Sequence, residues 1–162
     1  MNLKKIIAGF IISLSIIGTM TPLPSEGSES IYIKTHYIST ARGLSITREE
    51  FVLLAKLINA EARGETLVGQ VAVGAVVLNR LRDPRFPKTL VKVIYDQGQF
   101  SPVSDGSIDL PPGEKSLLAA ELALSGLDPT NGCLFFYNPA KAKSDWIDRI
   151  PTVVVIGSHV FG

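Results

Sequence analysis

Two glutamates four positions apart, Glu61 and Glu65, are the residues of this sequence whose type and spacing could do chemistry. Both lie in the stretch LINAEARGE (57–65), where a helix with one apolar face comes to its end. A carboxyl group that stays protonated near neutral pH can give a proton to a leaving oxygen and take one back. The question is which elements would place such a group in an apolar setting.

The helix that carries Glu61 is predicted to begin at Thr47. The residues TREE form a capping box, in which the Thr47 hydroxyl accepts from the Glu50 amide and the Glu50 side chain reaches back. At about 100° per residue, one side of this helix carries Phe51, Leu54, Leu57, Ile58 and Ala62. Glu61 falls inside that arc. Burial there, and the negative end of the helix dipole, would both favour the protonated acid.

Both glutamates also have interpretations that do not involve catalysis. Glu61 also fits a helix end where the side chain simply reaches water. Two carboxylates from one helix turn would lie on the same side of a sugar, whereas two-carboxylate glycosidases need them to flank it. We therefore interpret Glu65 as a supporting or substrate-binding residue, or as a first-turn acid of the next helix.

Further helices and one long loop should surround this helix. The pattern predicts helices over 69–82, 90–96 and 113–126, the last opened by Pro112. The first of them is apolar nearly all round and should be central. The stretch 97–112 is predicted to be an irregular loop. Because long loops in compact domains are usually functional or disordered, and this one carries an aromatic and amides, we expect it to form a wall of a cleft.

Strands are expected only near the end of the chain. The runs 133–138 and 152–162 have strand character, and the second should turn back as a hairpin at Gly157–Ser158. Helices first and a small sheet last predict an α+β domain over 47–162.

The N-terminal region has the layout of an export signal. A short basic segment, MNLKK, precedes the uncharged run IIAGFIISLSIIGTM. As a helix this run would extend over about 23 Å, short of the hydrocarbon core of about 30 Å. We expect 1–21 to be an export signal, with a retained N-terminal membrane anchor as the alternative. Residues 22–46, interrupted by prolines, a glycine and serines, are expected to be a linker.

Composition excludes several classes of function. Hydrophobic residues make up 46% and charged residues 19%, which is typical of a globular domain. The formal net charge of +1 gives no reason to expect nucleic acid as a partner. With one cysteine, two histidines and no H-x-x-x-H pair, we expect no dedicated metal site. Cys133 with His159 could act as a nucleophile and its base, but Cys133 opens an apolar strand and is more typical of a small core residue.

Three other residues suit carbohydrate binding. The stretch FFYNP is either core followed by a turn, or a place where Tyr137 and Asn138 present a phenol and an amide as a strand meets its loop. Trp146, in SDWIDR, is either a hydrophobic plug or a platform on which a pyranose ring could stack.

Several segments of the sequence together resemble a known protein family. The segments INAEARGETLVGQVAVGAVVLNRLRDPRFPKTLVKVIY, GQFSPVSDG, LDPTNGCLFFYNPAKAKSDWI and VVVIGSHVFG resemble the SleB/CwlJ cell-wall hydrolases, the spore-cortex-lytic enzymes. They follow the family's order and spacing from about Leu53 to Gly162. The resemblance implies a lysozyme-like α+β fold, with a helical lobe and a small C-terminal sheet. It also implies action on the glycan strands of peptidoglycan, with the first glutamate of A-E-A-R-G-E, here Glu61, as the catalytic acid.

The resemblance further implies the chemistry of a lytic transglycosylase. Such an enzyme cuts between N-acetylmuramic acid and N-acetylglucosamine and leaves a 1,6-anhydro ring, with one carboxylic acid and neither cofactor nor metal. By the same resemblance, the glycan-binding residues are Arg63, Glu65, Gln99, Phe100, Tyr137, Asn138 and Trp146. For Arg63 and Glu65, which stand in the same motif as Glu61, the alternative is that they hold the loop of that motif. We expect an exported monomer in the cell wall, acting on spore cortex or on vegetative peptidoglycan. The alternatives are a muramidase or glucosaminidase that uses water, an amidase or peptidase using Cys133 and His159, and a non-catalytic wall-binding module.

Overall fold

The computed structural model describes residues 38–39, 43–142 and 151–162. The predicted export segment, most of the predicted linker and Trp146 lie outside these residues. In the part of the chain that the structure describes, no helix combines the length and the apolar character needed to cross a membrane. The first described elements are the short strands β1 (Ile38–Ser39) and β2 (Ser45–Ile46), which pair in antiparallel fashion. Ile46 is buried, so packing against the core starts just before Thr47.

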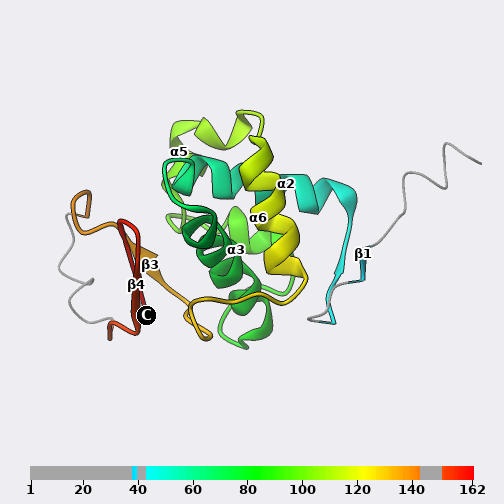
Figure 1. Cartoon of the computed structure of the whole chain (residues 1–162). Helices are drawn as coiled ribbons and strands as arrows, with labels where there is room; N and C mark the ends of the chain where they lie inside the picture. Colours follow the sequence, from blue (N-terminus) through cyan, green and yellow to red (C-terminus); the bar gives the residue numbers. More distant parts are fainter. Residues whose placement is uncertain (1–37, 40–42, 143–150) are drawn as a thin grey trace, which may run out of the picture. The chain divides into compact units, whose positions relative to one another are not determined.

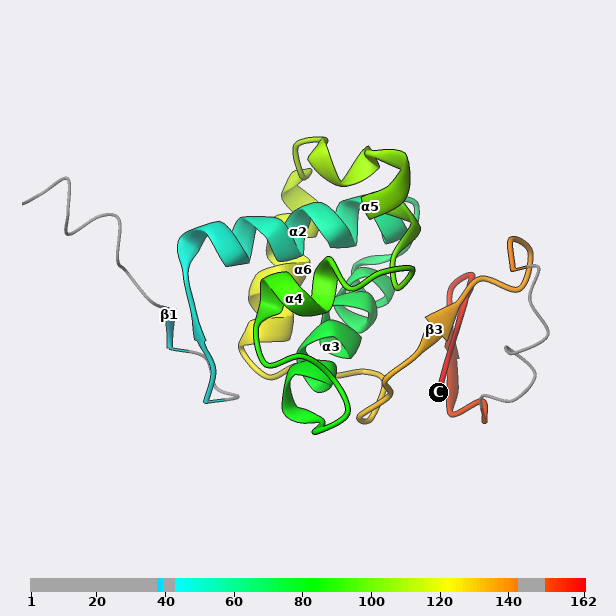
Figure 2. The same cartoon turned by 180° about the vertical axis from the view of Figure 1, so that it is seen from behind.

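The helices form one lobe around a central helix (Figures 1 and 2). They are α2 (Arg48–Ala62), α3 (Leu67–Arg82), α4 (Leu90–Ile94), α5 (Ser101–Asp105), the 3-10 helix η1 (Ser107–Asp109) and α6 (Glu114–Leu124). Helices α2, α3 and α6 pack against one another, and α4 packs against both α2 and α3. Helix α3 is buried on nearly every side, which confirms that the apolar helix is central.

Helix α2 begins with the predicted capping box. The Thr47 hydroxyl accepts from the Glu50 amide at 3.1 Å, and Glu50 Oε2 accepts from the Thr47 amide at 3.0 Å. The side chains of Leu54, Leu57 and Ile58 are fully buried. The cap fixes where α2 begins, and its apolar side fixes which face meets the core.

Close packing of the three main helices depends on Gly74 in α3. A Cβ at this position would lie 2.9 Å from Ile58 Cδ1 of α2 and 3.2 Å from Ala123 Cβ of α6. With glycine here, neither neighbour has to shift, whereas a Cβ would displace the Ile58 side chain and crowd Ala123.

The prediction for 97–112 is wrong in part, because this stretch contains α5 and η1. Pro102 stands in the first turn of α5, where a missing N–H costs nothing, and Gly106 ends the helix with φ +79°. A five-residue helix is too short to leave a periodic signal in the sequence. Helix α6 likewise begins at Glu114, after the N-cap Gly113, and not at Pro112.

The sheet follows the helices, as predicted for an α+β fold. Strands β3 (Phe136–Tyr137), β4 (Val154–Ile156) and β5 (His159–Phe161) are antiparallel and lie in the order β3-β5-β4. The hairpin turn at Gly157–Ser158 is confirmed, with φ +59° at Gly157. The strand predicted over 133–138 is limited to two residues, although Phe135 also exchanges backbone hydrogen bonds with Gly162.

Candidate functional site

A cleft of about 800 Å³ runs between the helices and the sheet. One wall comes from the C-terminal end of α2 and from the segment 98–107, which includes α5. The opposite wall comes from β3 and the residues that follow it to 142, and His159 of β5 completes it. The expectation that the segment between α4 and α6 forms a cleft wall is therefore met.

Glu61 lines this cleft from the last turn of α2. Burial raises the pKa of its carboxyl from the ordinary 4.5 to about 7, the charge of Asp105 adds to the rise, and the charge of Lys141 opposes it. Asp105 and Lys141 line the same cleft. Within the described residues, no donor holds the Glu61 carboxyl by a hydrogen bond. The acid thus keeps its proton at a higher pH than an ordinary glutamate, and that proton is available to a molecule in the cleft.

The cleft brings together four of the other predicted site residues. Gln99 and Phe100 come from the segment after α4, whereas Tyr137 and Asn138 come from β3 and its end. The two segments meet through aromatic packing, because the ring centroids of Phe100 and Phe136 lie 6.3 Å apart.

Arg63 and Glu65 are not among the residues that line the cleft. The Arg63 side chain is exposed. Glu65 Oε2 accepts from the amide of Ser158 at 3.2 Å, and its Oε1 lies 3.7 Å from His159 Nδ1. Glu65 therefore contacts the β4–β5 hairpin. Trp146 is outside the described residues.

Sequence reasoning missed Arg80, which also lines the cleft. A charged residue inside an otherwise apolar helix was the available signal. Its side chain is only 4% exposed, and burial lowers the pKa of the guanidinium to about 10, so it remains a cation at neutral pH. Asp105 and Lys141 were missed too, because nothing in the sequence relates them to Glu61.

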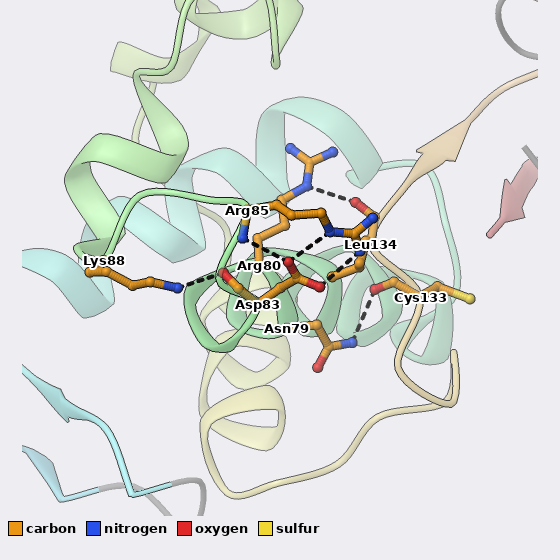
Figure 3. Close-up of polar contacts among 7 residues, drawn as sticks. All are labelled: Asn79, Arg80, Asp83, Arg85, Lys88, Cys133 and Leu134. Carbon is orange, nitrogen blue, oxygen red and sulfur yellow. Dashed lines mark hydrogen bonds and ion pairs between the residues drawn. The ribbon is translucent and has the colours of Figure 1, made fainter.

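The end of α3 holds the chain that leads into β3 (Figure 3). Asn79 Nδ2 donates to the carbonyl of Cys133 at 3.1 Å, and Arg80 Nε donates to the carbonyl of Leu134 at 2.7 Å. Two consecutive side chains of the helix thereby bind two consecutive backbone carbonyls. These two hydrogen bonds fix the position of the chain just before β3, and so the position of the cleft wall that starts at β3.

Cys133 and His159 lie in different surroundings. Cys133 lines a separate pocket of about 360 Å³, its Sγ donates to the carbonyl of Thr130 at 3.0 Å, and burial raises the pKa of its thiol. His159 packs edge-on against Phe136 beside Glu65, and burial lowers the pKa of its imidazole. A raised thiol pKa opposes formation of the thiolate that a cysteine nucleophile requires. Across the described part of the chain, no three His, Cys, Asp or Glu side chains gather as a metal site would need.

Comparison with known protein families finds a match that covers most of the described helices and strands. The profile of the Cell Wall Hydrolase family matches residues 64–162 and so starts three positions after Glu61. A spore cortex-lytic enzyme of Halalkalibacterium halodurans is 45% identical over 109 residues, which cover 67% of this chain and 33% of that protein. The chain spans between about a third and a half of the length of the first curated relatives.

Two solved structures resemble the fold over most of their own length. The catalytic domain of the germination-specific lytic transglycosylase SleB from Bacillus anthracis is 40% identical, with a TM-score of 0.68, and the match covers 71% of this chain and 94% of that one. The catalytic domain of the Bacillus cereus SleB protein is also 40% identical, with a TM-score of 0.67 and coverage of 72% and 91%. These structures confirm the predicted α+β fold class.

Proposed function

Because this chain belongs to the cell wall hydrolase family, we propose that it cleaves the glycan strands of peptidoglycan as a lytic transglycosylase. The bond cut is that between N-acetylmuramic acid and N-acetylglucosamine. The observation that carries the proposal is the position of Glu61, a carboxyl with a pKa of about 7 in a cleft of about 800 Å³. A cleft of that size can accept sugar units, and a general acid works best when its pKa is near the working pH.

One carboxyl group suffices for the reaction. Protonated Glu61 gives its proton to the glycosidic oxygen while the bond from that oxygen to C1 of the muramic residue breaks. The resulting carboxylate then takes the proton from the C6 hydroxyl of the same muramic residue. The C6 oxygen bonds to C1 and closes the 1,6-anhydro ring, and Glu61 is again protonated for the next cycle.

A hydrolytic reaction is the second candidate, and Asp105 is the observation that favours it. Its carboxylate lines the same cleft, and hydrogen bonds from Ser107, including the backbone N–H at 2.8 Å, lower its pKa. A carboxylate that stays ionised could orient a water molecule toward C1, as the second acid of an inverting glycosidase does. In that reaction water, and not the C6 hydroxyl, would supply the new oxygen on C1.

The wider assignment follows from the family and from the sequence. We propose that residues 47–162 are the catalytic domain, that the enzyme acts as an exported monomer in the cell wall, and that it uses no cofactor. Gln99, Phe100, Tyr137, Asn138 and Trp146 are the proposed glycan contacts. Arg63 and Glu65, which lie outside the cleft lining, are proposed to support the loop after Glu61. Spore cortex, the substrate named for its relatives, is the proposed peptidoglycan.

Mass spectrometry of the soluble fragments released from purified peptidoglycan tests the reaction. Incubation with the full chain should release muropeptides with anhydromuramic ends, which are one water lighter than hydrolysed ends. Ordinary reducing ends would establish the hydrolase, and cuts confined to the peptide would implicate Cys133. Binding without any released fragment would identify a wall-binding module.

A further inference from the structure

Arg80 is a buried cation whose direct partners are all neutral. Besides the bond to the Leu134 carbonyl, its guanidinium lies 5.1 Å from the ring centre of Phe86, 5.2 Å from that of Phe100 and 5.4 Å from that of Phe135. Three rings and a carbonyl leave the guanidinium little freedom to move. A buried cation is costly, so a site that holds one this firmly calls for an explanation.

The remaining partner of Arg80 is Gln99 at the edge of the cleft. Arg80 Nη1 donates to Gln99 Oε1 at 3.1 Å. Arginine can only donate, so the amide oxygen of Gln99 must face Arg80 and the amide NH₂ group must face away from it. The Gln99 side chain is exposed and lines the cleft. Its Nε2 thus offers two N–H donors to the contents of the cleft.

We propose that Arg80 is a positioning residue that fixes the Gln99 amide as a hydrogen-bond donor to an acceptor oxygen of the glycan strand. The identity of that ligand rests on the proposed function. A free glutamine could turn either its oxygen or its nitrogen toward a sugar, whereas this one is oriented before the ligand arrives. Carbonyl oxygens of acetamido groups and hydroxyl oxygens are the acceptors that a glycan provides.

Arg80 also links the two walls of the cleft. Gln99 and Phe100 belong to the wall that contains α5, and Leu134 and Phe135 lead into β3 on the other side. One side chain from α3 contacts all four residues. It therefore sets the orientation of a donor and the separation of the walls together.

The sharpest test replaces the donor without removing the contact with Arg80. In Gln99→Glu one carboxylate oxygen can still accept from Arg80, while the other takes the place of the NH₂ group and cannot donate. Binding is measured by co-sedimentation with insoluble peptidoglycan in a Glu61→Gln background, so that turnover does not interfere. We expect binding at least about tenfold weaker. The variant loses one hydrogen bond and places a carboxylate oxygen against an acceptor oxygen of the glycan, and together these changes should cost more than about 1.4 kcal/mol of binding free energy.

Gln97→Glu is the matched control. Gln97 stands two positions earlier, is exposed and is not among the residues that line the cleft. The substitution adds the same charge, and binding should stay within about twofold of the parent. A charge-free variant, Gln99→Met, should weaken binding as Gln99→Glu does. Unchanged binding of both Gln99 variants, or an equal loss in Gln97→Glu, would overturn the proposal.

The part played by Arg80 is tested by a double-mutant cycle. If Arg80 acts through Gln99, Arg80→Lys weakens binding in the parent protein but adds nothing to Gln99→Met. Independent losses that simply multiply would overturn the positioning role.

Thermal unfolding tests the contact between Arg80 and Gln99 without any Arg80 variant. Gln99→Glu should raise the Tm through a charge-assisted bond to Arg80, whereas Gln97→Glu should not, and a fall in Tm would contradict the contact.

Failure of this proposal differs from failure of the proposed function. Anhydromuramic products from the wild type, together with normal binding by the Gln99 variants, would overturn the role of Arg80 and Gln99 alone. No binding of the Glu61→Gln parent to peptidoglycan and no glycan products from the wild type would overturn both.

Discussion

Glu65 Oε1 lies 3.7 Å from His159 Nδ1, and the other oxygen of the same carboxylate accepts from the Ser158 amide at 3.2 Å. The contact joins the loop between α2 and α3 to the hairpin of β4 and β5. Glu61, one helical turn earlier, lines the cleft, and His159 lines it from the opposite side. The two glutamates of one short motif therefore differ in position, since one faces the cleft and the other holds the hairpin that borders it.

The contact predicts that Gly157→Ala destabilises the fold. A Cβ at Gly157 would overlap Glu65 Oε2, and the φ of +59° is unfavourable for alanine. We expect the free energy of unfolding in urea to fall by about 2 kcal/mol or more. Gly43→Ala, with φ +71° and no described atom within 4 Å of its Cβ, is the control for backbone strain alone. Gly157→Ala should cost less in a Glu65→Ala background, and equal losses in the two glycine variants would contradict the overlap.

Glu61→Gln should abolish glycan cleavage while leaving the fold intact. Glutamine has nearly the same shape but cannot supply a proton, and loss of a general acid lowers rates by about 10²-fold to 10⁴-fold or more. The release of soluble muropeptides measures the effect, and circular dichroism checks the fold. Glu121→Gln, at an exposed position of α6, should keep full activity. A fully active Glu61→Gln protein would refute the assignment.

The pKa of Glu61 predicts how activity depends on pH. Since the protonated form is the acid and the pKa is about 7, the rate constant for cleavage should fall as the pH rises through that value. Asp105→Asn removes a charge that raises this pKa, so it should move the fall to lower pH. A profile that keeps rising through pH 8 would contradict the role of Glu61 as acid.

The same pKa predicts a change in stability with pH. Between pH 4.5 and about 7 the folded protein keeps a proton on Glu61 that the unfolded chain has released, so stability falls as the pH rises. The full difference corresponds to about 3 kcal/mol, reduced where water reaches the carboxyl. Urea unfolding should therefore find Glu61→Gln more stable than the wild type at pH 8, with that advantage largely gone at pH 4. An equal gap at both pH values would rule out the raised pKa.

Cys133→Ser should leave cleavage unchanged. The Cys133 thiol donates to the Thr130 carbonyl in a pocket apart from the cleft, and a serine hydroxyl can make the same bond. Burial of the more polar hydroxyl should cost stability of about 1 kcal/mol. Activity is compared with the wild type at a temperature where both are folded. Loss of cleavage by a folded variant would revive the cysteine-dependent alternative.

Sequence alone was sufficient for features that depend on near neighbours. The Thr47 capping box, the central apolar helix and the Gly157–Ser158 turn each involve residues within a few positions of one another. The same holds for the presence of Glu61 on the apolar side of α2, because helical periodicity is local. The α+β fold class followed from the order of such elements. Helix α5 was the exception among local features, since five residues are too few to show a period.

Tertiary structure decided which of these residues meet. Gln99 could be proposed as a glycan contact from the sequence, but its orientation depends on Arg80, 19 positions away. Glu65 had several plausible roles until the hairpin, 93 positions on, was seen to donate to it. Cys133 and His159 were possible partners until they were found in separate surroundings. Such contacts arise from the packing of whole elements, and the free energy that selects them is shared among many residues, so no short segment encodes them.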